Sequence, residues 1–177
     1  MEKEIKRDKE RLVAAVLVRW FCLILFVSKD DRLTIPTETY ERKKEADLKD
    51  TAYRGLEEEL GIKEEEIDFE ITSLGTHLRN KGSPVTERIL FEFFPGKVTR
   101  EVARKIKFKE GEQFWLYPIR ALRECNLDGL AVEGVRRYLR RHPVRRGFLE
   151  TAYLFYYLTR RLKWWDKKIS DFSIYCR

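Results

Sequence analysis

The sequence predicts a single α/β domain, in which a mixed β-sheet is covered by helices on both faces, with a helical extension at the C-terminus. Three observations predict this α/β/α sandwich. Strand-favouring apolar residues fill 12–28. An amphipathic helix pattern fills 48–60, and further strand patterns and then helix patterns follow it. The 177 residues are 43% hydrophobic, which is enough to form a core and argues against global disorder.

The first apolar run, from Leu12 to Val27, is interrupted by Arg19. It is shorter than the roughly 20 apolar residues that a membrane-spanning helix needs, and we expect no transmembrane segment. Because Val, Ile and Phe are frequent in it, we expect two buried strands or one long bent strand. A further strand is expected over 32–35, ended by Pro36, and the polar residues 37–47 are expected to form a loop.

The next element is a helix over 48–60, whose apolar residues recur at every fourth position and form one stripe. The stripe consists of Leu48, Ala52, Leu56 and Leu60. Asp47 can cap the start of this helix, and Gly61 can adopt the left-handed conformation just beyond its end.

The rest of the chain continues the alternation of strands and helices. We expect an acidic connector over 63–68, strands over 69–77 and 85–94 joined by a turn at 79–84, a break at 95–96, a short strand over 114–116, and helices over 119–123, 130–140 and 146–164. Residues 97–113 show no clear pattern.

The positive charge is concentrated near the C-terminus. The net charge is +7, but residues 136–177 hold twelve Lys or Arg against three Asp or Glu, a balance of +9, so residues 1–135 sum to −2. Such asymmetry favours a polyanionic partner, such as RNA or an acidic protein, although a solvated basic face has the same composition. The three cysteines, Cys22, Cys125 and Cys176, are widely spaced and form no CxxC pair, which favours a reducing, cytoplasmic location.

The C-terminal residues form a second unit in this interpretation, with a main domain over 1–142 and a basic, aromatic-rich extension over 143–177. Residues 148–158 are apolar almost all round a helix, and such a helix must be buried. It can pack on the domain, form a homodimer, bind single-stranded RNA, or lie on a membrane surface with Trp164 and Trp165 at the interface.

Three consecutive glutamates, Glu57, Glu58 and Glu59, end the helix over 48–60. Adjacent helix positions lie about 100° apart, so two of the three can reach one metal ion. Magnesium prefers few carboxylates, several waters and phosphate oxygens. Arg54 lies four residues before Glu58 and can orient that carboxylate. A solvated acidic helix end is the alternative.

The order of these residues resembles the second half of the Nudix box, G-x5-E-x7-R-E-U-x-E-E-x-G-U, where U is a bulky aliphatic residue. The matching segment is RGLEEELGI, from Arg54 to Ile62. A second similarity is the segment 109–115, KEGEQFW, where many Nudix proteins carry a further glutamate before a strand that contains tryptophan. The resemblance covers roughly residues 11–125 and implies a Nudix-like α/β/α sandwich.

The sequence also departs from the Nudix pattern. The paired glycines expected after Pro36 are Thr37 and Glu38, the upstream glutamate of the box is Ala46, and the glutamate expected directly after Arg54 is Gly55. Other carboxylates can compensate for these losses, and the candidates are Glu41, Glu45, Asp47, Glu57, Glu110 and Glu112.

The resemblance implies a pyrophosphohydrolase that depends on Mg2+ or Mn2+ and hydrolyses a nucleoside diphosphate derivative. The catalytic residues implied are Arg54, Glu58 and Glu110. The metal ligands implied are Glu58, Glu59, Glu110 and Glu112. Candidate phosphate contacts to the substrate are Arg42, Lys44, Arg79 and Lys81. The alternative is a catalytically weakened Nudix-fold module that binds a nucleotide, RNA or a protein partner.

Overall fold

A computed structural model describes residues 9–29, 31–41, 46–70, 72–81, 87–108 and 111–161. Its strands are β1 (Lys9–Trp20), β2 (Leu23–Lys29), β3 (Arg32–Thr34), β4 (Thr37–Thr39), β5 (Ile67–Phe69), β6 (Thr76–Lys81), β7 (Glu87–Val98) and β8 (Gln113–Leu116). Its helices are α1 (Leu48–Leu60), the 3-10 helix η1 (Glu64–Glu66), α2 (Arg100–Lys105), α3 (Pro118–Glu124), α4 (Gly129–Arg141) and α5 (Pro143–Arg161).

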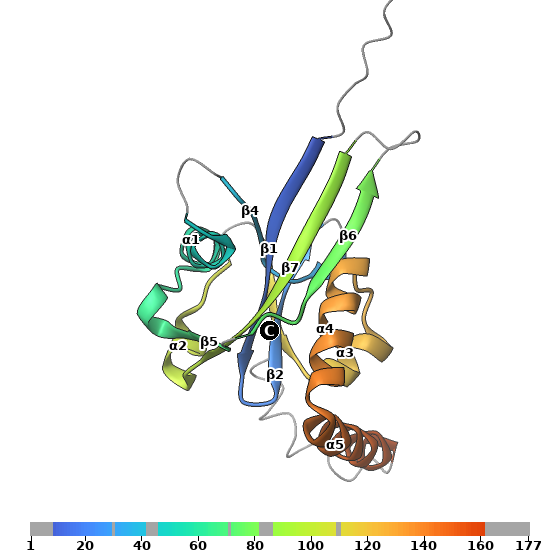
Figure 1. Cartoon of the computed structure of the whole chain (residues 1–177). Helices are drawn as coiled ribbons and strands as arrows, with labels where there is room; N and C mark the ends of the chain where they lie inside the picture. Colours follow the sequence, from blue (N-terminus) through green and yellow to red (C-terminus); the bar gives the residue numbers. More distant parts are fainter. Residues whose placement is uncertain are drawn as a thin grey trace, which may run out of the picture.

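All eight strands belong to one mixed sheet, as the sequence predicts. The order along its main path is β3-β2-β1-β7-β5, while β4 pairs with β1, β6 with β7 and β8 with β2. β1 and β7 are parallel, and the other pairs are antiparallel. Figure 1 shows α1 and α2 on one side of the sheet, and α3 and α4 on the other. The predicted α/β/α architecture is confirmed.

Alternation along the central strands builds two cores, one on each face of the sheet. Ala15 and Leu17 of β1 face the core under α3, α4 and α5. Ala14 and Val16 face the core under α1 and α2. Apart from Arg19, the run from Leu12 to Val27 is therefore apolar because both of its faces are buried.

This run forms two strands joined by a tight turn, which confirms one of the two expected arrangements. Phe21 at the turn has a positive φ of 53° and is exposed. Arg19, which interrupts the run, is only 7% exposed, and its Nη2 lies 2.7 Å from Oε1 of Glu70. A carboxylate partner thus offsets the cost of burying this cation.

α1 has the predicted bounds, because local interactions define both of its ends. The Asp47 carboxylate accepts hydrogen bonds from the backbone N–H groups of Lys49 (2.7 Å) and Asp50 (2.9 Å). Gly61 adopts the left-handed conformation with φ of 68°. Ala52 and Leu56 are buried in the core between α1 and the sheet.

Three expectations for the short strands are wrong. The expected loop over 37–47 contains β4, which pairs with β1. The expected strand over 69–77 is replaced by β5 and β6, which both pair with β7. The turn was expected to begin at residue 79, but β6 extends to Lys81. Cross-strand pairing decides these segments, since strands of this length have little preference of their own.

The break expected at Pro95-Gly96 is also wrong, because β7 continues to Val98. The Pro95 carbonyl accepts a hydrogen bond from the backbone N–H of Glu70 (2.9 Å), so the ring nitrogen points away from β1 and interrupts no bond to that strand. At Gly96, an added Cβ would lie 2.5 Å from Cδ1 of Ile67. The glycine therefore allows β5 to approach β7 closely.

The C-terminal helices follow the predicted order. α3 and α4 include the predicted ranges, and α5 begins at Pro143, which suits the first position of a helix. Leu149 of α5 is 3% exposed and belongs to the core under α3 and α4. The division of the chain at 142/143 stays a prediction, and residues 162–177 lie outside the described residues. Within the described residues, no helix combines the length and the hydropathy needed to cross a bilayer.

Candidate functional site

The candidate site lies where β4 meets the exposed side of α1. β4 is held on β1 by register pairs from Val13–Thr39 to Ala15–Thr37. The backbone N–H of Tyr40, just after β4, donates to the carbonyl of Leu12 at 2.9 Å. α1 packs through its buried stripe on the face of the sheet that carries Ala14 and Val16 of β1. These contacts hold Glu38 of β4 against the helix.

Arg54 connects β4 to the end of α1. Its guanidinium donates to the carbonyl oxygen of Thr39 at 3.0 Å, to Oε1 of Glu38 at 3.3 Å and to Oε2 of Glu58 at 3.4 Å. Oε1 of Glu41 lies 3.9 Å away. The Arg54 side chain is only 23% exposed, so this cation is held in place between carboxylates from two elements.

Glu38 occupies the space beside Gly55. A Cβ added to Gly55 would lie 2.5 Å from Cβ and 3.0 Å from Cγ of Glu38. Gly55 is buried, so no larger side chain fits at this position without movement of β4 or α1. The Glu38 side chain of β4 thus packs against Gly55, the position at which the Nudix pattern has a glutamate, and its Oε2 would lie 3.5 Å from the added Cβ.

Glu58 and Glu59 point into different surroundings. Glu58 faces Arg54 and is 59% exposed. Glu59 lines a cavity of about 350 Å³ together with Thr37, Phe108 and Gly111. Glu59 thus lines one cavity with Phe108 and Gly111, whereas Glu58 belongs to the Arg54 cluster.

Glu110, Arg42 and Lys44 lie outside the described residues. Glu112 is exposed, and its carbonyl oxygen accepts a hydrogen bond from the backbone N–H of Ser28 at 2.8 Å. This bond places the backbone of Glu112 beside β2.

Arg79 and Lys81 are exposed on β6. β6 pairs with β7, so β7 and β1 separate it from β4. The ammonium group of Lys81 lies 3.8 Å from Oε2 of Glu87 across the β6–β7 pair. The two cations are thus not gathered with Arg54 and Glu58.

The donor chemistry of the site favours a hard cation. Its described carboxylates are Glu38, Glu41, Glu58 and Glu59, and oxygen ligands suit Mg2+ and Mn2+. Across the part of the chain that the structure describes, no three His, Cys, Asp or Glu side chains cluster closely enough to form a complete metal site. A magnesium ion held by one or two carboxylates, water and substrate phosphate needs no such cluster.

Glu38 is the site residue that the sequence interpretation missed. The signal was present in two departures from the Nudix pattern, a glutamate where glycine is expected and a glycine where glutamate is expected. In the sequence, each departure looks like the loss of a residue that the Nudix pattern requires. Only the tertiary structure shows that the two positions lie against each other, at Gly55.

Comparisons with known proteins find similarity in structure. No protein-family model and no curated protein matches the sequence. A MutT protein from Methanosarcina mazei Go1 is similar with a TM-score of 0.60 and 15% identity, covering 76% of this chain and 96% of that one. An Ap4A hydrolase from C. elegans has a TM-score of 0.58 and 12% identity, covering 72% and 94%.

The NUDIX domain of NrtR from Shewanella oneidensis, solved with ADP ribose, has a TM-score of 0.59 and 11% identity, with 79% and 93% covered. Most of the length of each of these three proteins is therefore matched, although few residues are identical. The chain has the Nudix fold.

Proposed function

We propose that this protein is a pyrophosphohydrolase that uses Mg2+ or Mn2+ to hydrolyse a nucleoside diphosphate derivative. One observation carries the proposal: Glu38 from β4 lies against Gly55 and shares the Arg54 guanidinium with Glu58. In this proposal Glu38 supplies the carboxylate that the Nudix box lacks at Gly55. The Nudix fold supports the same reaction class.

In this proposal Glu58 and Glu59 are the metal ligands from α1, with Glu110 and Glu112 as further ligands. Arg54 orients Glu58 and Glu38 through the bonds described above. Glu110 is the general base that removes a proton from the attacking water. A bound divalent ion supplies neutralisation of the diphosphate charge and of the leaving phosphate.

The phosphate contacts proposed are Arg42 and Lys44, which lie in the connection between β4 and α1. Arg79 and Lys81 are kept as proposed contacts for a distal part of the substrate, because β6 lies on the far side of β1 and β7 from β4. Cations at such positions reduce the repulsion between a diphosphate and the carboxylates.

The test is turnover of a panel of nucleoside diphosphate derivatives by the full chain with Mg2+ or Mn2+. We expect E58Q, E59Q and E38Q each to lower kcat/KM by about tenfold to a hundredfold. E65Q is the control, because Glu65 is an exposed carboxylate of η1 that belongs to none of the proposed ligand sets. Equal activity of E58Q, E59Q and the wild type would refute the proposed site.

The second candidate is a Nudix-fold module that binds a nucleotide without hydrolysing it. The observation that favours it is the position of Arg54, which already neutralises part of the charge of Glu38 and Glu58. This candidate predicts saturable nucleotide binding by calorimetry, no product after long incubation with metal, and no effect of E59Q on affinity.

A further inference from the structure

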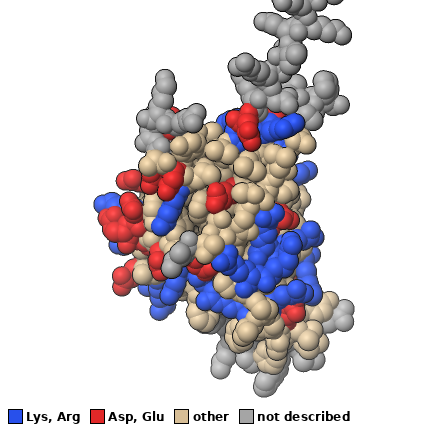
Figure 2. Space-filling model, viewed as in Figure 1, with Lys and Arg blue, Asp and Glu red and all other residues tan. Residues whose placement is uncertain are grey.

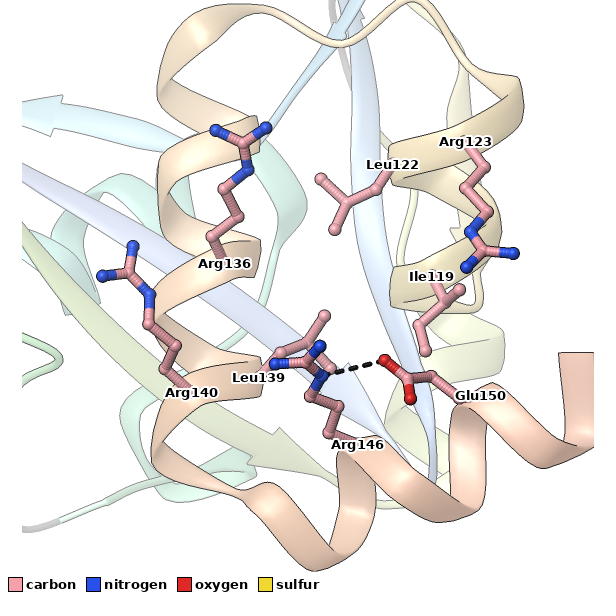
Figure 3. A pocket seen from close by; sticks show the side chains of 8 residues that line it. All are labelled: Ile119, Leu122, Arg123, Arg136, Leu139, Arg140, Arg146 and Glu150. Carbon is pink, nitrogen blue, oxygen red and sulfur yellow. Dashed lines mark hydrogen bonds and ion pairs between the residues drawn. The ribbon is translucent and has the colours of Figure 1, made fainter.

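A second cavity lies between α3, α4 and α5, on the opposite face of the sheet from α1. Its volume is about 330 Å³. Four arginines and one glutamate surround a floor of three aliphatic side chains, and the lining residues are Ile119, Leu122, Arg123, Arg136, Leu139, Arg140, Arg146 and Glu150. Figure 3 shows the arginines coming from all three helices around this floor.

The cavity keeps an excess of positive charge. Arg146 donates to Glu150 at 2.8 Å, which uses the carboxylate in the lining. Arg140 lies 3.8 Å from Glu133, whose carboxylate is already bound by Arg137 at 2.7 Å. That close contact with Arg137 also holds the pKa of Glu133 below its usual value.

Among the described residues, the other two cations of the cavity have no carboxylate partner. Arg123 lies over the ring of Tyr153, 5.2 Å from its centroid, and among the described residues it forms no ion pair. Arg136 likewise forms no ion pair within the described ranges. Two guanidinium groups at this cavity are thus available to an anion.

The positive charge extends beyond the cavity. Figure 2 shows a broad surface of Lys and Arg in the region of α4 and the start of α5. Arg141 and Arg145 are exposed there, beside Arg140 and Arg146. A single small anion would contact only part of such a surface, whereas a chain of regularly spaced anions can follow it.

The choice of cation also indicates the chemistry of the ligand. All ten basic residues of 118–161 are arginines, and this segment contains no lysine. Arginine offers a planar, bidentate donor set that matches phosphate, and lysine does not. Ile119 and Leu139 are buried and close the bottom of the cavity, whereas the partly buried Leu122 offers apolar surface to a sugar or base next to those phosphates.

We propose that the cavity between α3, α4 and α5 binds the phosphodiester backbone of a single-stranded nucleic acid. A single strand is favoured over a duplex, because its unstacked sugars and bases can enter the cavity and contact Leu122. Arg136 and Arg140 contact phosphates, and Arg123 binds the strand at the other rim. The site does not depend on catalysis at α1.

The test is binding of fluorescein-labelled oligouridylate to the full chain, followed by fluorescence anisotropy over a range of salt concentrations. We expect R136Q/R140Q to weaken binding by roughly tenfold and to flatten the plot of log Kd against log salt by about 0.7 for each lost phosphate contact. The matched control is R100Q/K105Q, which removes the same charge from exposed positions of α2 on the other face of the sheet. We expect the control to bind like the wild type.

The proposal would be overturned if the wild type did not bind the oligonucleotide, whether or not it bound anionic phosphatidylserine vesicles. Equal weakening by R136Q/R140Q and R100Q/K105Q would also overturn it. Competition by inorganic pyrophosphate at concentrations similar to those of the oligonucleotide would point to a small-anion site and would also contradict it. Thermal unfolding of each variant shows whether the fold is retained. This assay measures binding and not turnover. A negative result would therefore contradict the nucleic-acid site without contradicting the proposed hydrolase activity.

Discussion

Glu38 packs directly against Gly55: a Cβ added to Gly55 would lie 2.5 Å from Cβ of Glu38. The first residue belongs to β4 and the second to α1, so their contact fixes how closely the helix approaches the strand. The same contact places Glu38 beside Arg54, at 3.3 Å. Backbone packing and the charge arrangement of the candidate site are therefore coupled at this position.

This contact predicts the effect of G55A. Alanine is intrinsically better than glycine in a helix by about 1 kcal/mol, but overpacking typically costs about 1–3 kcal/mol. Because the atom it meets is a Cβ that cannot rotate away, we expect G55A to lower the free energy of unfolding in urea. In an E38G background the clash is removed, and G55A should then raise it. Destabilisation of similar size in both backgrounds would contradict the contact.

The buried pair of Arg19 and Glu70 gives a second prediction. Removal of one partner leaves a buried charge uncompensated, which costs about 3–5 kcal/mol for a fully buried pair. Since the Glu70 side chain is 25% exposed, we expect E70A to lower the free energy of unfolding by about 2–3 kcal/mol. The control is D68A, an exposed carboxylate of β5 two residues away, for which we expect a change within about 0.5 kcal/mol.

A third prediction concerns pH. Burial lowers the pKa of His142 below its ordinary value of 6.5, and Glu70, 3.4 Å away, opposes that shift only in part. The unfolded chain therefore binds this proton more readily than the folded one. The contribution of neutral His142 to the free energy of unfolding is therefore fully present above pH 6.5. It is lost as the pH falls through the lowered pKa of His142 in the folded protein.

H142Q should remove this contribution, so that the free energy of unfolding depends less on pH between about 7 and 5. H77Q is the matched control, because it replaces the other histidine of the chain. Identical pH profiles for H142Q and the wild type would show that His142 is not the group responsible.

The packing of α5 gives a fourth prediction, based on two adjacent residues. Leu149 is 3% exposed in the core, whereas Phe148 is 64% exposed. We expect L149A to lower the free energy of unfolding by about 2–4 kcal/mol and F148A to change it by less than about 0.5 kcal/mol. A single unfolding transition that shifts with L149A would indicate that α5 folds with the sheet, whereas no shift would support a separate unit at 143–177.

Local signals explain why α1 could be predicted residue by residue. Asp47 and Gly61 act on the backbone within a few positions of themselves, and the four-residue spacing of Leu56 and Leu60 needs no distant partner. The apolar run of β1 and β2 was predicted for a similar reason, since burial on both faces produces a continuous pattern. The resemblance at Arg54–Ile62 agrees with the observed fold.

Elements that depend on distant partners could not be predicted in this way. β4 exists because β1 pairs with it, and β7 passes through Pro95 because that residue has its carbonyl, not an N–H, bonded toward Glu70. In both cases the deciding contact is with a residue far away in the sequence. The same is true of the arginine cavity, whose lining comes from three helices.

The amino-acid sequence was sufficient for the fold class and the bounds of α1, because these depend on periodicity and helix caps. Tertiary structure alone decided that Glu38 fills the space beside Gly55, that Glu58 and Glu59 face different surroundings, and that a basic cavity lies on the opposite face. The physical reason is that side-chain packing and charge act through space, between residues whose separation along the chain leaves no periodic trace.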